Sequence, residues 1–189
     1  DILTFVAGDI ITLDIDQIAT GAADLVLVLS VAGSAGGGGA MNDYIKVSEV
    51  QAANTGGGTF TSGSFVTRVI NTEDSDTGGH CSVASNQITL AAGTYTCSIS
   101  APAFQVDRHK AILYNVTDAA NTLIGTSEFT TTAIAQTRSV ITGKFTIAGS
   151  KVFEVRHRCQ TTKTTQGLGV ESNFGVSEVY TVAEFWKVG

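Results

Sequence analysis

One stretch near the middle of the chain decides the fold, residues 90–118, which reads "LAAGTYTCSISAPAFQVDRHKAILYNVTD". Gly93 marks a turn, and Tyr95, Cys97 and Ile99 then fall on one face of an extended segment, which is the two-residue period of a half-buried strand. A second apolar run of strand length, "KAILYNV", follows after a short polar crossing. Two adjacent strands of this kind predict a β-sheet protein.

Similar signals alternate along the rest of the chain from Tyr44 onward. "GTFTSGSFVTRVI" has the composition of a strand and leads into an acidic turn, "NTEDSDTGGH". "RSVITGKFTIAGSKVFEVRHRC" predicts two strands around Gly149, and "VSEVYTVAEFWKV" predicts a last one. No helical period extends over more than a few residues. Many short strands at this spacing predict an antiparallel sandwich or jelly roll.

Composition and charge exclude several classes of protein. The chain has 189 residues, of which 43% are hydrophobic and 15% are charged, so it can bury a core and is not of the disordered type. It contains 21 glycines and one proline, which indicates many turns and excludes collagen. The net charge is −6. An acidic chain without a basic stripe is not expected to bind nucleic acid.

The sequence divides into an N-terminal arm, a linker and a main domain, predicted at residues 1–35, 36–43 and 44–189. The arm holds two strand patterns, "DIITLDID" and "LVLVLSV", and two strands are too few to fold alone. We therefore expect the arm to attach to another surface through its most apolar residues, which are Leu25, Val26, Leu27, Val28 and Leu29.

The same apolar run is far shorter than the roughly 20 residues that cross a membrane, so no membrane insertion is expected. No signal-peptide pattern is present. Because the chain begins with Asp1, we expect it to be a processed product or a portion of a longer polypeptide.

The densest charge lies in the run from Asp107 to Lys110. On a strand, Asp107 and His109 share one face and Arg108 and Lys110 share the other. No serine or cysteine is marked as a nucleophile beside them, so the run is interpreted as a polar face at a subunit seam or as a solvated strand end. We predict no catalytic residue.

His157 falls on the same face as Phe153, Val155 and Cys159, and it is interpreted as a core-facing histidine with one ring nitrogen bonded to a neighbour. A metal site formed by His157, His109 and a cysteine has no supporting ligand spacing. No cofactor is predicted.

The three cysteines are Cys81, Cys97 and Cys159. Their spacing matches no zinc or redox motif, and reduced thiols that behave as small apolar side chains are the favoured interpretation. A Cys81–Cys97 bridge stays open if the protein is extracellular.

The acidic turn offers hard oxygen ligands of the kind that calcium prefers. They do not follow the twelve-residue pattern of an EF-hand, so a solvated turn is the favoured interpretation and no metal site is predicted. The candidate ligands are Asn71, Glu73, Asp74 and Asp76.

Four segments, taken in order and spacing, resemble the C1q/TNF-like domain found in many bacteriophage structural proteins. The resemblance runs from about Glu49 to Lys187 and is carried by "NTGGGTFTSGSFVTRVINTE", the opening stretch, "GTSEF" and "NFGVSEVYTVAEFWKV". It implies an all-β, antiparallel jelly-roll sandwich whose copies pack in threes about an axis. It also implies that the charges of "DRHKAILYNV" are structural or interfacial.

A homotrimer would bury the large apolar residues of the last strand, which exceed the needs of one core. The trimer-interface candidates are Tyr180, Phe185, Trp186, His109 and Arg108.

The resemblance implies a non-enzymatic module on the virion surface, assembled in the host cytoplasm. The leading hypothesis is a tail-fibre tip that binds a host-surface glycan or protein, with the arm contacting other virion proteins. A capsid decoration or cement protein is the second hypothesis, and a secreted or cell-surface adhesive module or filament subunit is the third.

Overall fold

A computed structural model of the chain describes residues 43–131 and 134–188. The predicted arm, with Leu25–Leu29, and all of the predicted linker except Asp43 lie outside the described residues. The described part is all-β and contains no helix. Consequently, none of its elements is a helix long and apolar enough to cross a membrane.

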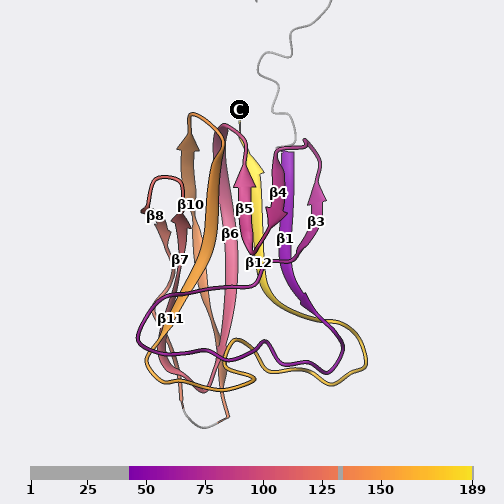
Figure 1. Ribbon diagram of the computed structural model, residues 1–189, viewed down its shortest axis with the longest axis vertical. Coiled ribbons are helices and arrows are strands. Elements are labelled where there is room, and N and C mark those ends of the chain that lie inside the picture. Colours follow the sequence, from indigo (N-terminus) through magenta and orange to yellow (C-terminus); the bar gives the residue numbers. More distant parts are fainter. Residues whose placement is uncertain (1–42, 132–133, 189) are drawn as a thin grey trace, which may run out of the picture. The chain divides into compact units, whose positions relative to one another are not determined.

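Twelve strands make up the described part (Figure 1). In chain order they are β1 (Asp43–Gln51), β2 (Val66–Thr67), β3 (Thr72–Asp76), β4 (Cys81–Ala84), β5 (Gln87–Leu90), β6 (Gly93–Phe104), β7 (Asp107–Asn115), β8 (Ala120–Ile124), β9 (Glu128–Thr130), β10 (Gln136–Ile147), β11 (Lys151–Cys159) and β12 (Glu178–Lys187).

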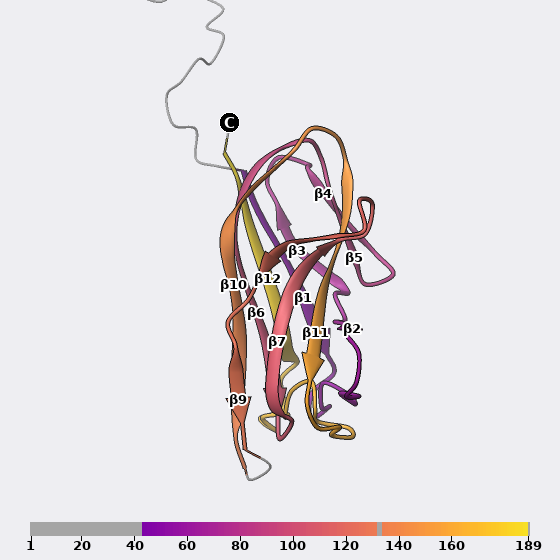
Figure 2. The same ribbon diagram turned by 90° about the vertical axis from the view of Figure 1, so that its left-hand side faces the viewer.

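The strands form two antiparallel sheets that pack face to face (Figure 2). Sheet I has the order β10-β6-β12-β1-β3, and sheet II has the order β4-β5-β11-β7-β8, with β2 paired to β11 and β9 paired to β7. The longest pairing, β10 with β6, runs unbroken from Gln136↔Phe104 to Ile147↔Gly93. The predicted antiparallel sandwich is therefore confirmed.

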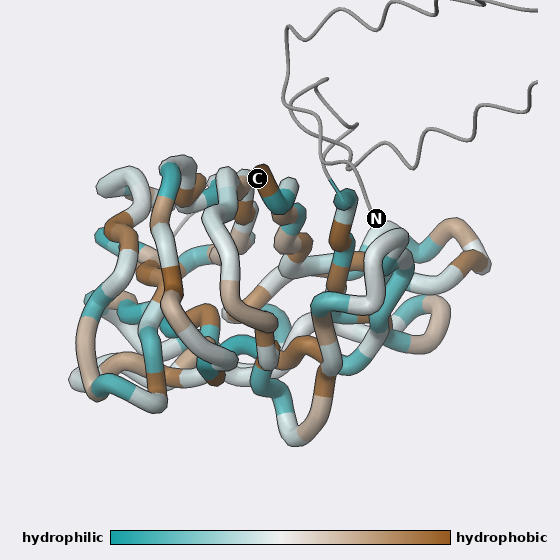
Figure 3. The backbone as a smooth tube through the Cα atoms, turned by 90° about the horizontal axis from the view of Figure 1, so that it is seen from above, coloured by the Kyte–Doolittle hydropathy of each residue, from teal (hydrophilic) through white to brown (hydrophobic). Residues whose placement is uncertain are grey.

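Alternation of side chains across each strand builds the core between the sheets. Ile45 and Ile99 from sheet I meet Leu113 and Phe153 from sheet II, and all four are fully buried. Brown and pale segments alternate along the strands in Figure 3 for the same reason. Burying each such side chain contributes about 1.5–3 kcal/mol.

Two predictions for residues 58–80 are wrong. The segment "GTFTSGSFVTRVI" forms only the two-residue strand β2, and most of it is a loop. In the acidic segment that follows, Thr72–Asp76 form strand β3 at the edge of sheet I, and the turn is confined to residues 77–79. Short polar side chains carry no apolar alternation, so pairing with β1 decides that β3 is a strand.

Two long segments, residues 52–65 and 160–177, lie side by side at one end of the sandwich. Backbone hydrogen bonds join them, among them Gly57 N to Gly169 O at 2.9 Å and Phe60 N to Lys163 O at 2.9 Å. Phe60 belongs to a second, smaller core cluster, which also contains Val106 and other buried residues.

A buried ion pair connects these segments to sheet I. Arg68 and Glu49 are both fully buried, and Arg68 Nη2 lies 2.8 Å from Glu49 Oε2. Arg68 also donates to Thr181 Oγ1 at 2.7 Å, to the Pro102 carbonyl at 3.1 Å and to the Leu168 carbonyl at 2.7 Å. Burial lowers the pKa of Arg68 below its ordinary value, and the Glu49 carboxylate acts in the opposite direction.

We expect Arg68→Met to destabilise the fold by about 3–5 kcal/mol, because it leaves the Glu49 carboxylate buried without a cation. Adding Glu49→Met should recover part of that loss. The matched control is Lys151→Met, which breaks the partly exposed pair with Asp118 and should cost less than about 1 kcal/mol. Urea unfolding at one chain concentration measures all four proteins. Equal losses for Arg68→Met and Lys151→Met would contradict the role of the buried pair.

Candidate functional site

The outward side of sheet I presents a flat surface, which we call the sheet I face. Its half-buried aromatic and apolar side chains include Tyr44 on β1 with Val182 and Trp186 on β12. Strand β6 beside them contributes a row of short hydroxyl side chains. This row consists of Thr94, Thr96, Ser98 and Ser100.

Cross-strand register brings the aromatic members of this face together. Trp186 is opposite Tyr44 on one side and Thr96 on the other. The two aromatic ring centroids are 5.6 Å apart, and Tyr44 Oη donates to Glu184 Oε1 at 2.5 Å. Burial, followed by the bond to Glu184, raises the pKa of Tyr44 to about 12. The tyrosine is therefore a fixed, neutral hydrogen-bond donor.

Val182 stands further along β12, opposite Ser48 and Ser100. Arg138 on β10 reaches across this part of the face and donates to Ser100 Oγ at 3.0 Å and to the Tyr180 carbonyl at 2.9 Å. These bonds hold the Arg138 guanidinium against the neighbouring strands.

The structure separates the five predicted interface residues. Trp186 belongs to the sheet I face. Phe185 is fully buried in the core, and His109 is buried between the sheets, so neither side chain can contact another subunit. Arg108 is exposed on the outward side of sheet II, away from Trp186.

Tyr180 is also withdrawn from the surface, at 2% exposed. Its hydroxyl donates to the Thr55 carbonyl at 2.6 Å, and its ring packs against Gly169, where φ is +148° and any Cβ would overlap the ring. The long segments at the end of the sandwich therefore cover Tyr180. The expectation that Tyr180 and Phe185 offer surplus apolar surface is wrong.

His157 is core-facing and bonded through one ring nitrogen, as predicted from the sequence. His157 Nε2 lies 3.0 Å from His109 Nδ1, and His109 Nε2 lies 2.7 Å from Thr137 Oγ1. The Phe60 ring packs on the other side of His157, with centroids 4.7 Å apart. Burial lowers the pKa of His109 to about 4 and that of His157 well below its ordinary value. Both rings are neutral at pH 7.

The described residues contain no group of histidine, cysteine and acidic side chains that could hold a metal ion. Cys81, Cys97 and Cys159 are free thiols, with no Cys81–Cys97 bridge. Burial raises their pKa values to about 12, 11 and 11 respectively. A thiol needs a lowered pKa to act as a nucleophile near neutral pH, so these cysteines are suited to packing.

Three of the four candidate calcium ligands, all except Glu73, are bonded to their own chain. Asn71 exchanges side-chain hydrogen bonds with the backbone of Val50, at 2.9 and 2.8 Å. Asp74 accepts from Ser48 Oγ at 2.7 Å. Asp76 accepts from the His80 and Cys81 amides. These bonds fix strand β3 to β1 and to the turn before β4.

Comparisons with known proteins show which known fold this chain resembles. No protein-family model matches the chain, and no curated protein sequence matches it. A crystal structure of murine APRIL at pH 5.0 covers 78% of this chain and 99% of its own, with 8% identity and a TM-score of 0.52. The fold is a C1q/TNF-like jelly roll.

Two further solved structures are similar at lower scores. The globular domain of zebrafish complement 1qA covers 78% of this chain and 98% of its own, at 13% identity and a TM-score of 0.47. The PRD1 vertex protein P5 covers 80% of this chain and 100% of its own, at 10% identity and a TM-score of 0.46.

The buried histidine pair predicts a loss of stability in mild acid. Below about pH 6.5 the unfolded chain takes up protons on both histidines, whereas the folded chain does not until about pH 4 for His109 and lower for His157. Stability is therefore complete above pH 6.5 and falls as the pH drops towards 4. We expect the melting temperature to fall by several degrees over this window.

The matched variant is His109→Gln with His157→Gln, which removes both titrating groups and keeps side chains that can hydrogen bond. Its melting temperature should fall less between pH 6.5 and 4, because the carboxylates shared by both proteins contribute equally. Parallel curves for the two proteins in thermal melts would show that the pair does not control the acid response.

Proposed function

We propose that the protein is a non-enzymatic binding module that assembles as a homotrimer through the sheet I face. The single observation that carries this proposal is a C1q/TNF-like jelly roll with Trp186, Tyr44 and Val182 gathered on one flat sheet surface. Aromatic side chains are enriched in subunit interfaces, and the short hydroxyls of β6 allow close approach.

Sheet II is less suited to be the trimer interface. Its outward side carries Arg108, Lys110, Arg156 and Arg158, and charged residues are depleted in the cores of interfaces. On the sheet I face, Arg138 and Glu184 are bonded within the chain. A trimer built on sheet I leaves sheet II free for ligands.

A non-enzymatic role is supported by the chemistry of the reactive side chains. The thiols and the two buried histidines have pKa values shifted in the direction that keeps them neutral. None of them is activated as a nucleophile or general base in the described part of the chain.

We propose further that the module lies on a virion surface, at the tip of a tail fibre, where it binds a receptor on the host. The support is the resemblance of four sequence segments to phage C1q/TNF-like domains. In this proposal residues 1–35 attach the domain to other virion proteins, since "LVLVLSV" is too apolar to remain in solvent.

Light scattering on the purified full chain tests the trimer. We expect a mass three times the 19.5 kDa of the single chain. Val182→Arg should give single chains with an unchanged far-ultraviolet circular dichroism spectrum, because it buries a charge at the centre of the face. The matched control is Ser82→Arg, on the exposed strand β4 of sheet II, and it should remain a trimer. A native mass of 19.5 kDa would contradict the proposal.

Antibody labelling of purified particles in the electron microscope tests the location. We expect label at the fibre tips, and we expect a chain without residues 1–42 to stay a folded trimer that is absent from particles. Label over the head would favour a decoration protein instead. Loss of folding after the deletion would show that the N-terminal residues belong to the jelly roll and would contradict the attachment role.

A further inference from the structure

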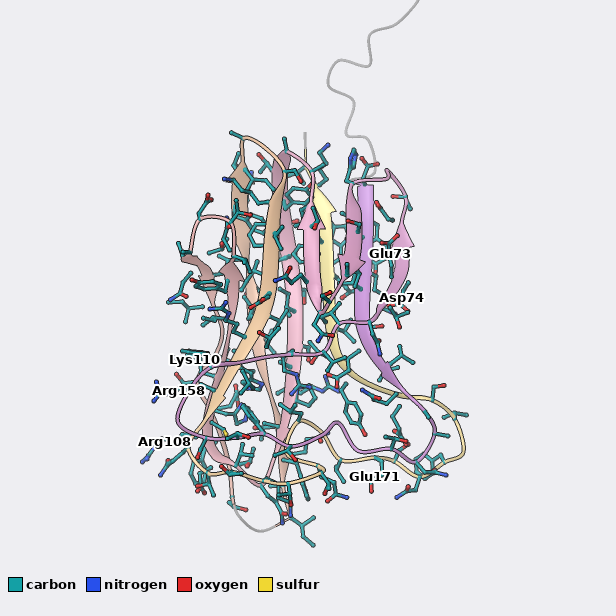
Figure 4. The ribbon with its side chains drawn as sticks, viewed as in Figure 1. Glu73, Asp74, Arg108, Lys110, Arg158 and Glu171 are labelled. Atoms are coloured by element: carbon teal, nitrogen blue, oxygen red, sulfur yellow. The ribbon has the colours of Figure 1, made fainter. Side chains whose placement is uncertain are left out.

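An open groove of about 1040 Å³ lies on the outward side of sheet II, at the end where β7 begins and β11 ends. Its floor is formed by Arg108 and Lys110 of β7 with Arg158 of β11, and its walls include Phe65 and Phe129. Figure 4 shows the three labelled cations together on one side of the molecule. The groove is separate from the sheet I face.

The cations of the floor oppose one another directly. Arg158 is the cross-strand partner of Lys110. Arg108 lies two residues before Lys110 on β7, so the two side chains share one face of the strand. Like charges directly opposite each other destabilise a sheet. None of the ion pairs found within the described residues involves these three side chains. An anion in the groove would relieve their repulsion.

Local contacts orient the cationic side chains of the floor but do not neutralise their charge. Arg108 Nη1 donates to Gln160 Oε1 at 3.0 Å, and this acceptor is uncharged. The single carboxylate that lines the groove is Glu128, which accepts from Thr126 Oγ1 at 2.7 Å. Three cations against one carboxylate leave the groove positively charged in a chain whose net charge is −6.

The walls add two accessible phenyl rings. Phe129 is 55% exposed and Phe65 is 41% exposed, and Phe129 is the cross-strand partner of Arg108. A phenyl ring beside a cation suits a ligand that has both an apolar face and an anionic group. A sugar ring with a carboxylate or sulfate substituent has this combination, because its C–H groups form an apolar face.

We propose that this groove binds an acidic glycan, with its carboxylate or sulfate on Arg108, Lys110 and Arg158 and a sugar face on Phe129. The inference names the ligand class of the proposed receptor-binding module, and it rests on that function only in requiring that the module binds a ligand. Arginine favours such anions because its planar guanidinium donates two parallel hydrogen bonds.

Nucleic acid and acidic peptide fit the groove less well. Binding a nucleic acid requires a basic track along many phosphates, whereas this floor holds three cations within one end of a sheet. An acidic peptide would satisfy the cations but would make no use of flat, exposed phenyl rings.

Binding of the full chain to defined probes tests the inference. Polysialic acid supplies carboxylates, heparin supplies sulfates, and dextran is an uncharged polysaccharide. We expect saturable binding to at least one acidic probe, weakened by salt, and no binding to dextran. Lys110→Ser with Arg158→Ser should weaken binding about tenfold or more, because it removes two charge-assisted contacts. Phe129→Ser should weaken binding to the polysaccharide as well.

The matched control is Lys151→Ser with Lys187→Ser, which removes the same charge from strands β11 and β12 outside the groove and should bind as the native chain does. Failure to bind either acidic polysaccharide would overturn the inference. Equal binding of a DNA duplex or of polyglutamate, lost in the same groove variant, would also overturn it and would assign the groove to that class.

The oligomeric mass of each variant separates this inference from the proposed trimer. A groove variant that keeps the native mass but loses binding supports the glycan site whatever that mass is. Dissociation of the Lys110→Ser, Arg158→Ser variant would show that the groove lies between copies of the chain, and the inference would be wrong. A native chain that is monomeric yet binds the glycan would contradict the trimer alone.

Discussion

The buried pair of Arg68 and Glu49 is the constraint on which the rest of the structure depends. Both side chains are fully buried, and the guanidinium also holds the carbonyls of Pro102 and Leu168. A charge removed from water requires hydrogen-bonded partners. The guanidinium has four of them, whereas Glu49 Oε1 has none within the described residues. The pair therefore fixes β1, β6 and the segment before β12 relative to one another.

Both proposed surfaces follow from this arrangement. The segments at the end of the sandwich cover Tyr180. Of the outward-facing side chains of β12, Val182 and Trp186 therefore remain on the sheet I face. Three residues before Arg68, the same segment carries Phe65, which forms a wall of the groove on sheet II. One buried cation thus connects the segments that border the proposed interface on one sheet and the groove on the other.

Charge is distributed unevenly over the domain. In Figure 4 the cations Arg108, Lys110 and Arg158 lie on one side of the view, and Glu73 and Asp74 lie on the other. The acidic pair belongs to edge strand β3, where exposed charge discourages pairing with the edge of another sheet. Negative charge thus protects the sheet edge, and the groove on the other side of the view carries three cations.

The sequence predicted the strands whose apolar residues alternate, such as β6 and the pair β10 and β11, because burial on one face leaves a period of two. It also predicted the core-facing His157. It failed for β3, where pairing with β1 decides the structure of a polar segment. Arg68 gave no signal, since two of its partners are backbone carbonyls and the others are distant in sequence.

The prediction that Tyr180, Phe185 and His109 contact another subunit was wrong for a related reason. Alternation correctly separated Trp186 from Phe185, but it does not tell which side of a strand faces the core or which residue is covered by a distant loop. Tyr180 is covered by Thr55 and Gly169. The groove was missed because Arg158 and Lys110 are separated along the chain and meet only through the register of β7 and β11.

Collisional quenching of tryptophan fluorescence tests the central claim, that sheet I is covered by sister subunits, most directly. Trp186 is the single tryptophan of the chain and lies on the sheet I face, so its emission reports on this surface alone. The account predicts that acrylamide quenches Trp186 weakly in the native protein and strongly in the Val182→Arg variant. Equal, strong quenching in both proteins would show that the sheet I face is open to solvent and would contradict the account.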